Sequence, residues 1–340
     1  MISVTPLTRE EYQSCCAQEG LQLPIEQTPL WADFEETIPG RTFFGFYRVD
    51  AQKPEGNSFL CCIAFMKYET HGFSFLRAHH GPVWKMPPTK DQEEQVIKAL
   101  VGTIKNADPS IAFLRIAVEH YKELSEPVLS TVPYNETVKI DLSDPTEDAI
   151  LATFKSRGRR DVRKSLRESS ATFHDETAQA ALDFSPYYEL MVETAQRDGF
   201  VPAPQKDYEN FLRILGPDHT RVYVSRVDDK IVSWSIVTLQ GEEAVRYYGA
   251  SINNRETRAV DKQVLKEAAA LASAGAKRYD LMGIGSDDFS PSIKPLREFK
   301  TKFAQETVFV APDRDVPIKK TLYRALKLVK AIQLLFLRND

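Results

Sequence analysis

The chain has 340 residues, about twice a usual domain length, so it is too long for one small module and predicts two packed units. Its composition, 42% hydrophobic and 27% charged, excludes a disordered, collagen-like or coiled-coil chain. The net charge of the whole chain is −4, which does not predict a nucleic-acid partner. The first residues lack the basic and apolar regions of a signal peptide, and no apolar run reaches about 18 residues, so we expect a cytoplasmic protein.

The first half of the chain predicts three strands, a helix and a further strand. Apolar runs mark the strands, and a turn-rich stretch at 52–57 separates the first two. The predicted strands cover residues 42–49, 59–68, 73–83 and 112–118. Helical spacing of apolar residues precedes the last strand, at Val96, Leu100, Val101 and Ile104.

The second half predicts the same order of elements, preceded by one more helix at 187–197. Its strands cover residues 221–227, 231–239, 245–251 and 279–284. A helix around 264–272 comes before the last strand and ends at Gly275, the residue type favoured just past helix ends. Because strands and helices do not alternate throughout, we expect a duplicated α/β unit rather than one doubly wound sheet, with a linker near 141–146.

The four cysteines form two adjacent pairs without zinc-site spacing or histidine partners. Cys61 and Cys62 fall in a predicted strand, where neighbouring side chains point to opposite faces, so we interpret the cysteines as packing residues. His79 and His80 stand at a strand end and are interpreted as structural. Without an HExxH or Gly-x-Ser-x-Gly motif, neither metal-dependent nor serine hydrolysis is predicted.

Residues 155–167 carry seven basic side chains and one acidic one, unlike the rest of the chain. Such a cluster attracts a polyanion because screening makes nearby charges matter most. Phe154 is the only ring close by, so we expect contacts to phosphate rather than stacking on bases. The alternative interpretation is a solvated helix face. The candidates for binding tRNA phosphates or a pyrophosphate are Arg157, Arg159, Arg160, Arg163 and Lys164.

The C-terminal segment 319–338 predicts an amphipathic helix. Basic side chains follow one stripe at Lys320, Arg324 and Lys327. Apolar side chains follow another stripe, at Leu322, Leu326 and Val329. Such a helix either packs back on the body of the protein, which we favour, or makes a peripheral contact with an anionic membrane, here the inner membrane surface.

Five further segments resemble the FemABX family of nonribosomal peptidyltransferases. They are Gln27-Thr28-Pro29-Leu30-Trp31, Gly81-Pro82-Val83, Tyr247-Tyr248-Gly249-Ala250-Ser251, residues 276–284 and residues 296–303. The resemblance covers nearly the whole chain and implies two tandem GNAT-like (acetyltransferase-like) domains of the α/β (α+β) class, each a mixed sheet flanked by helices. It looks like the compact form without a coiled-coil arm. The implied domains are 1–142 completed by 308–340, and 143–307.

Members of this family carry an amino acid from aminoacyl-tRNA onto the peptide of a peptidoglycan precursor. The resemblance therefore implies an aminoacyltransferase of cross-bridge formation, whose partners are aminoacyl-tRNA and a nucleotide-linked or lipid-linked precursor. It implies no cofactor and no metal. An aminoacyl ester is already activated, so its aminolysis needs a neutral amine held close and a positive donor for the developing oxyanion.

Three residues match positions with a role in the family. Lys300 matches the lysine of the Phe-Lys motif, which implies that it binds the tRNA end or stabilises the transition state. Tyr248 matches the tyrosine before Gly-Ala-Ser, and Tyr208 matches a tyrosine of the substrate-contacting loop. Otherwise Lys300 would be a surface lysine, and each tyrosine an ordinary half-buried ring.

Four positions depart from the family pattern. Some compact members grip the precursor's phosphates with a lysine and an arginine where this chain has Glu35 and Pro204. Ala117 replaces an acidic residue and Arg246 replaces a tyrosine. Because alternate strand residues share a face, we expect Arg246 to lie on the side of Tyr248 and to bind acceptor phosphate there. Further candidates for this role are Arg41, Arg77 and Lys206.

Two other functions stay open. One is an acyl-CoA-dependent N-acyltransferase, although the segment 253–259 lacks the glycines that let backbone amides cradle a pyrophosphate. The other is a relative without catalytic activity that binds tRNA or a cell-wall precursor.

Overall fold

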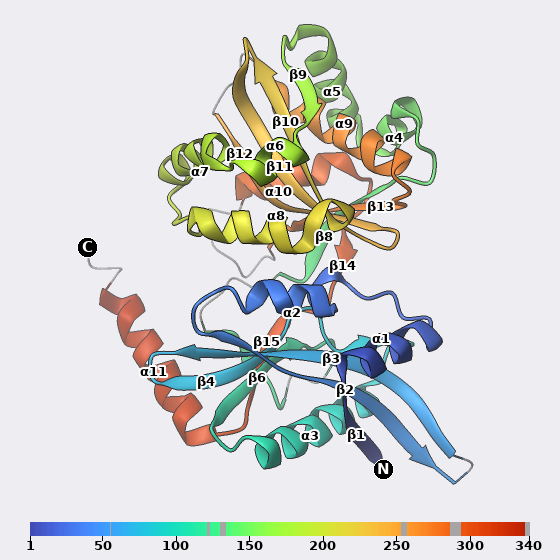
Figure 1. The fold of residues 1–340 in the computed structure, drawn as a ribbon, viewed down its shortest axis with the longest axis vertical. Coiled ribbons are helices and arrows are strands. Elements are labelled where there is room, and N and C mark those ends of the chain that lie inside the picture. The colour runs from blue at the N-terminus through green and yellow to red at the C-terminus, as the bar shows by residue number, and fades with distance from the viewer. Residues whose placement is uncertain (55, 121–122, 130–133, 253–256, 286–293, 337–340) are drawn as a thin grey trace. The chain divides into compact units, whose positions relative to one another are not determined.

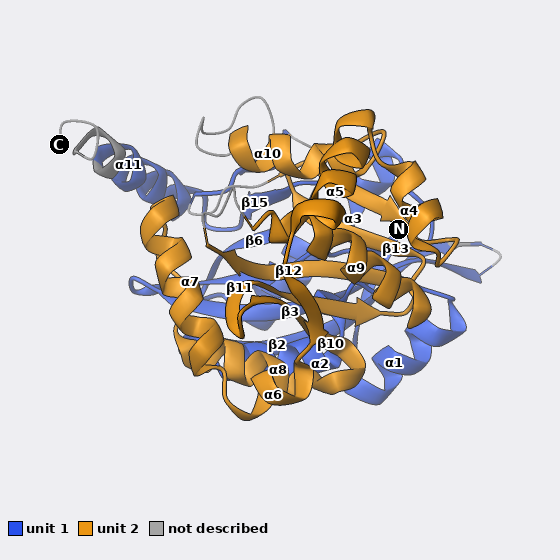
Figure 2. Cartoon of the chain, turned by 90° about the horizontal axis from the view of Figure 1, so that it is seen from above, with its two compact units in different colours: residues 1–133, 310–340 blue, residues 134–309 orange. Residues whose placement is uncertain are grey.

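The computed structural model describes residues 1–54, 56–120, 123–129, 134–252, 257–285 and 294–336. The chain divides into two compact units, shown in Figure 2: unit 1 is Met1–Pro133 with Val310–Asp340, and unit 2 is Tyr134–Phe309. We expected the linker near 141–146, but Glu136–Asp141 is a strand of the second sheet, so the division falls before Tyr134. Within the described residues, no helix combines the length and apolar character needed to cross a membrane.

Unit 1 is built on an eight-stranded mixed sheet (Figure 1). Its strands run in the order β1, β2, β3, β4, β6, β15, β7, and β5 pairs with β3. All neighbours are antiparallel except β4 and β6, which are parallel and are joined through α3. The strands are β1 (Ile2–Leu7), β2 (Arg41–Lys53), β3 (Gly56–Thr70), β4 (Phe73–Ala78), β5 (Val83–Trp84), β6 (Ile111–Ala117), β7 (Glu126–Pro127) and β15 (Asp313–Pro317).

Helices cover both faces of the sheet of unit 1. The helix α3 (Lys90–Ala107) begins with a capping box at Thr89 and Gln92 and buries its apolar stripe on one face. Cys61 packs on that face and Cys62 on the other, which confirms the expectation from strand geometry. The other face is covered by α1 (Arg9–Gln18) and α11 (Lys320–Phe336), and η1 (Ile25–Gln27) leads into the short α2 (Pro29–Glu35).

Unit 2 contains a seven-stranded sheet in the order β14, β8, β13, β12, β11, β10, β9. Neighbours are antiparallel except β12 and β13, which are parallel and are joined through α9. The strands are β8 (Glu136–Asp141), β9 (Thr172–Asp175), β10 (Thr220–Val227), β11 (Lys230–Gln240), β12 (Glu243–Ser251), β13 (Arg278–Gly283) and β14 (Val308–Phe309).

The core of unit 2 has one helical layer on each face of its sheet. One layer consists of α4 (Glu147–Thr153), α5 (Ser156–Glu168) and α9 (Ala259–Ser273), whose apolar residues pack together on the sheet. The other layer contains α6 (Thr177–Leu182), α7 (Ser185–Asp198) and α8 (Gln205–His219). After β13 the chain forms α10 (Lys294–Lys300) and η3 (Thr301–Phe303).

Both units contain the predicted order of three strands, a helix and a further strand. In unit 1 this order is β2, β3, β4, α3 and β6, and in unit 2 it is β10, β11, β12, α9 and β13. The first three strands form an antiparallel meander, and the strand after the helix returns parallel to the third. The duplicated mixed α/β architecture predicted from the sequence is therefore confirmed.

Candidate functional site

The two parallel strands of unit 2 separate soon after they pair. The strands β12 and β13 share three residue pairs, and the last joins Val245 to Asp280. Beyond it, β12 contains a bulge at Tyr247, because Ile236 and Val237 of β11 pair with Tyr248 and Arg246. In β13, Met282 has a φ of 64°, which is costly for a residue with a side chain. Both strands thus leave regular geometry at the point where they diverge.

Lys300 brings its ammonium group to this divergence. It is the last residue of α10, and its Nζ donates to the carbonyl oxygens of Gly283 at 3.0 Å and Met282 at 3.4 Å. Burial and, after it, the positive charge of Arg246 lower the pKa of Lys300 to about 8, against the opposing charge of Asp280. The lysine is therefore a half-buried, poorly solvated cation at neutral pH rather than the surface lysine of the alternative interpretation.

Arg246 follows Val245, the last residue of β12 that pairs with β13, and supplies a second cation, whose side chain is 13% exposed. Its Nη1 lies 3.4 Å from a carboxylate oxygen of Glu267 and forms no hydrogen bond with any described residue. Burial lowers the pKa of Arg246, but the electrostatic attraction of Glu267 and Tyr279 together outweighs burial, so the pKa is raised. Gly249 leaves space beside the guanidinium, since a Cβ there would stand 3.6 Å from Nε and Nη2.

The expectation that Arg246 and Tyr248 share a face is wrong. Arg246 points to the α9 layer, where Glu267 lies, whereas Tyr248 contacts the α8 residues Tyr208 and Phe211. The bulge at Tyr247 causes the difference, because an extra residue breaks the alternation of faces. Arg246 therefore does not stand beside the tyrosine as a phosphate-binding group.

Glu267, which the sequence analysis did not single out, connects this site to a buried polar network. Its side chain is fully buried and accepts hydrogen bonds from Tyr279 at 2.5 Å and Gln263 at 2.7 Å, and also from Ser235. Its position in α9 among Val264, Leu265 and Ala268 was the available signal, since an acidic side chain on an apolar helix face needs partners. The network holds the carboxylate that faces Arg246.

Tyr208 and Tyr248 do lie together, in an aromatic cluster on the α8 side of the sheet. Their ring centroids are 4.9 Å apart with a T-shaped arrangement. Tyr208 is buried and stacks on Phe184, and burial raises the pKa of its hydroxyl to about 12. Tyr248 is half-buried, so it is the more accessible of the two for a ligand.

The basic segment forms α5, whose inner side is fixed in the core. Gly158 permits this packing, because a Cβ there would stand 2.1 Å from the carbonyl oxygen of Lys302. Lys302 itself is buried and pairs with Asp261 at 2.5 Å and Asp161 at 3.5 Å. Lys302 thus ties α5 and α9 together and is a structural residue.

The outer side of α5 differs in part from the expected phosphate-binding set. Arg157, Arg160 and Arg163 are exposed. Lys164 is half-buried, 3.8 Å from Glu168, and Arg159 turns back to donate to the carbonyl oxygen of Phe154. Arg159 therefore does not belong to the exposed basic face, which we define as Arg157, Arg160 and Arg163.

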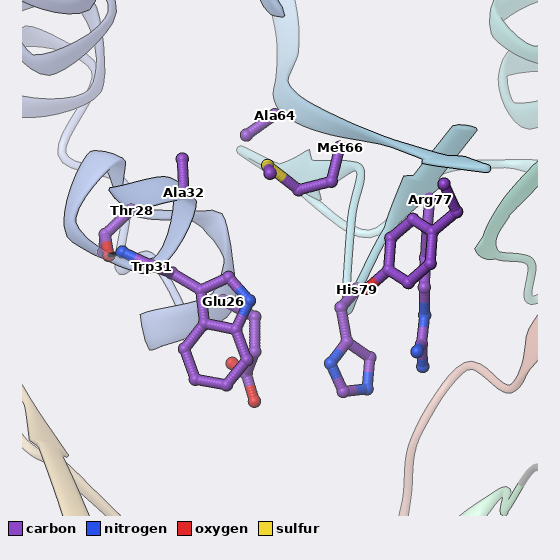
Figure 3. Close-up of a pocket in the computed structure, with 9 residues that line it drawn as sticks. Glu26, Thr28, Trp31, Ala32, Ala64, Met66, Arg77 and His79 are labelled. Atoms are coloured by element: carbon purple, nitrogen blue, oxygen red, sulfur yellow. Dashed lines mark hydrogen bonds between the residues drawn. The ribbon is translucent and has the colours of Figure 1, made fainter. Parts of the chain in front are cut away.

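Unit 1 contains a small pocket that the sequence analysis did not find, drawn in Figure 3. The figure shows the rings of Trp31 and His79 on opposite sides of it. Burial, followed by the charge of Arg77, lowers the pKa of His79 well below its usual range. One carboxylate and two imidazoles, those of Glu26, His79 and His80, bring possible metal-ligand atoms within 4.8 Å of one another.

Glu35 stands where some compact members of the FemABX family have a phosphate-binding lysine, and it contacts Tyr68, which lines this pocket. Glu35 is buried, accepts a hydrogen bond from Tyr68 at 2.6 Å and pairs with Arg41 at 2.9 Å. Arg77 pairs with Asp313 at 2.9 Å. The arginines Arg41 and Arg77 thus have carboxylate partners, while Pro204 and Lys206 are exposed in unit 2.

The comparisons with known proteins agree with this fold. Residues 155–290 match the family model for the acetyltransferase (GNAT) domain. No curated protein matches the sequence. The crystal structure of FemX has a TM-score of 0.72 at 15% identity and covers 96% of this chain and 100% of its own. Unit 2 thus contains the match to the GNAT domain, and the whole chain shares its fold with FemX.

Two further structures resemble the whole chain. One is a C-terminal domain assigned to a lysylphosphatidylglycerol synthetase from Agrobacterium fabrum, with a TM-score of 0.54, 15% identity and coverage of 96% of this chain and 98% of its own. The other is L-PGS from Bacillus licheniformis, with a TM-score of 0.52, 13% identity and coverage of 96% and 97%. At these identities the likeness concerns the fold alone.

Proposed function

We propose that this protein is an aminoacyltransferase that moves an amino acid from aminoacyl-tRNA to the stem peptide of a peptidoglycan precursor. The observation that carries the proposal is the half-buried ammonium of Lys300, held where β12 and β13 diverge and next to Arg246. A poorly solvated cation with a lowered pKa in a GNAT-type domain is suited to a reaction that develops negative charge on oxygen.

The chemistry requires little from the protein. The neutral amine of the acceptor attacks the ester carbonyl carbon, a C–N bond forms, and the carbonyl oxygen becomes an oxyanion. The ammonium of Lys300 stabilises that oxyanion, and the guanidinium of Arg246 adds positive charge behind it. When the intermediate collapses, the C–O bond to the ribose breaks, and the proton lost by the amine ends on the departing ribose oxygen.

Other described residues supply binding surfaces for the two substrates. We assign tRNA phosphate contacts to the exposed basic face of α5, because its side chains are accessible cations and no aromatic ring lies among them. We assign the acceptor peptide to Tyr248 with Tyr208 behind it. Arg246 acts on the reacting centre in this proposal and not on acceptor phosphate.

The test is a transfer assay with two donors. Purified protein receives a labelled aminoacyl-tRNA or labelled acetyl-CoA, together with a peptidoglycan precursor. We expect label from the tRNA to enter the precursor, and we expect K300M to lower the rate by about 10²–10³-fold, the usual effect of removing one oxyanion donor. The matched control K277M removes an exposed lysine of the same unit and should leave the rate unchanged.

The same assay decides the alternative functions. Consumption of acetyl-CoA with no transfer from tRNA would establish the CoA-dependent acyltransferase, which the match to the acetyltransferase domain keeps in contention. The segment weighed for CoA pyrophosphate, 253–259, lies partly outside the described residues. Binding of tRNA without transfer from either donor would establish the relative without catalytic activity.

A further inference from the structure

The C-terminal helix α11 has two apolar sides, and only one of them packs on unit 1. Tyr323 is buried beside Phe113 and Phe75, and Leu322 and Leu326 pack against the same cluster. This confirms part of the expectation that the helix packs back on the body. Figure 1 shows the far end of α11, in red, leaving the sheet of unit 1.

The other apolar side is exposed. Leu328 is 64% exposed, Val329 53% and Ile332 44%. Isolated exposed apolar residues are ordinary on protein surfaces, but these three form one patch. At about 100° per residue they fall within an arc of about 100° on the helix, which adjoins but does not overlap the arc that contains Leu322, Tyr323 and Leu326.

A basic stripe borders this exposed patch. By the same geometry Lys320, Arg324 and Lys327 fall within an arc of about 60° that lies next to Leu328. From 319 to 332 the chain carries five basic residues and no acidic one. Lys327 pairs with Glu126 of unit 1 at 2.8 Å, so the start of the helix is fixed while the patch lies beyond it.

We propose that the patch Leu328, Val329 and Ile332 rests on the surface of an anionic lipid membrane. An apolar arc flanked by cations is the form that binds lipid interfaces, since apolar side chains enter the acyl boundary and cations meet the headgroups. The same charges argue against a second copy, because two such helices would bring Lys320 and Arg324 of both copies together. The inference goes beyond the proposed transfer chemistry and does not depend on it.

Vesicle co-sedimentation of the full chain tests this inference. The vesicles consist of phosphatidylglycerol with phosphatidylcholine or of phosphatidylcholine alone. We expect binding to the anionic vesicles that weakens with salt, and at least a tenfold loss of affinity in L328S/V329S/I332S. The variant K320S/R324S should weaken binding about fivefold for each charge removed.

The control L182S/V201S removes two exposed apolar residues of unit 2 and should bind as the wild type does. Equal binding of the wild type and the triple variant to anionic vesicles would overturn the proposal. So would a wild-type dimer, measured by light scattering without lipid, that the triple variant converts to a monomer, because the patch would then join two copies. The assay contains no tRNA and no precursor, so its failure is distinct from failure of the transfer reaction.

Discussion

The parallel strand pairs of the two units differ in one respect that matters for function. In unit 1, β4 and β6 stay paired to the end of β4, where Ala78 pairs with Ile116. The buried Arg115 of β6 is neutralised by Asp315 of the added strand β15 at 2.7 Å. In unit 2 the strands part after Val245, and two half-buried cations, Lys300 and Arg246, lie where they diverge. The parallel pair thus extends to the strand end in one copy and stops early in the other.

The charged side chains beside the two strand pairs also have different partners. Arg115 and Asp315 are 3% and 0% exposed, and Arg115 also stacks on Phe75 and Phe113. This pair stabilises the junction of β6 with the returning C-terminal segment. Lys300 instead has only backbone carbonyls as hydrogen-bond acceptors in the described chain, which leaves its charge available. We therefore expect substitutions in unit 1 to affect stability and those at Lys300 to affect activity.

The largest effect on stability is expected from breaking the buried ion pair of unit 1, Arg115 with Asp315. D315A leaves the Arg115 guanidinium buried without its carboxylate and removes the nearer of two acceptors of the Tyr323 hydroxyl, at 2.9 Å. We expect the free energy of unfolding to fall by about 3–5 kcal/mol, measured by urea denaturation. The control D33A breaks an exposed pair with Arg9 and should cost at most about 1 kcal/mol. If D315A and D33A lower the free energy of unfolding equally, the Arg115–Asp315 pair has no special role in the stability of unit 1.

For K300M we expect the protein to become more stable rather than less. Burial and the charge of Arg246 lower the pKa of Lys300 from 10.5 to about 8, so at pH 7 the folded protein carries this poorly solvated charge at a cost. We expect K300M to raise the free energy of unfolding by about 1–3 kcal/mol at pH 7. Between about pH 8 and 10.5 the folded wild type binds fewer protons at this site than the unfolded chain does, so its own stability rises with pH and the advantage of K300M shrinks. A K300M protein that is less stable than the wild type at pH 7 would show that the lysine is a structural residue.

A smaller effect is expected at α5. R160Q/R163Q removes two exposed cations, so tRNA affinity should fall about fivefold to fiftyfold, and the dependence of affinity on salt should become less steep. Filter binding at several salt concentrations measures both quantities. R278Q, which removes an exposed arginine paired with Glu243, is the control. If R160Q/R163Q leaves the tRNA affinity and its dependence on salt unchanged, this side of α5 is an ordinary solvated surface.

The sequence predicted the elements that have strong internal periodicity. The meanders and the helices α3 and α9 were found because apolar residues recur at two and at about 3.6 residues. The strand β8 was missed, since its place in the second sheet depends on pairing with β13, which is far away in the sequence. Lys300 was found through the Phe-Lys motif alone, and its burial could not be read from neighbouring residues.

The side-chain directions were harder to predict than the elements. Strand alternation placed Arg246 beside Tyr248, but the bulge at Tyr247 is set by how β12 pairs with β11 and has no signature in the sequence. Arg159 belongs to a basic run, yet its guanidinium turns to a backbone carbonyl at the start of α5. In both cases tertiary packing overrides a local rule.

The dependence of the transfer rate on pH is the most direct test of whether Lys300 acts as a cation where β12 and β13 diverge. The rate of the wild type should fall above about pH 8, as the ammonium loses its proton. Because the charge of Arg246 lowers that pKa, R246Q should move the fall to higher pH, whereas R278Q should leave it in place. A profile of R246Q that falls at the same pH as the wild type, or a wild-type rate that keeps rising beyond pH 9, would contradict the account.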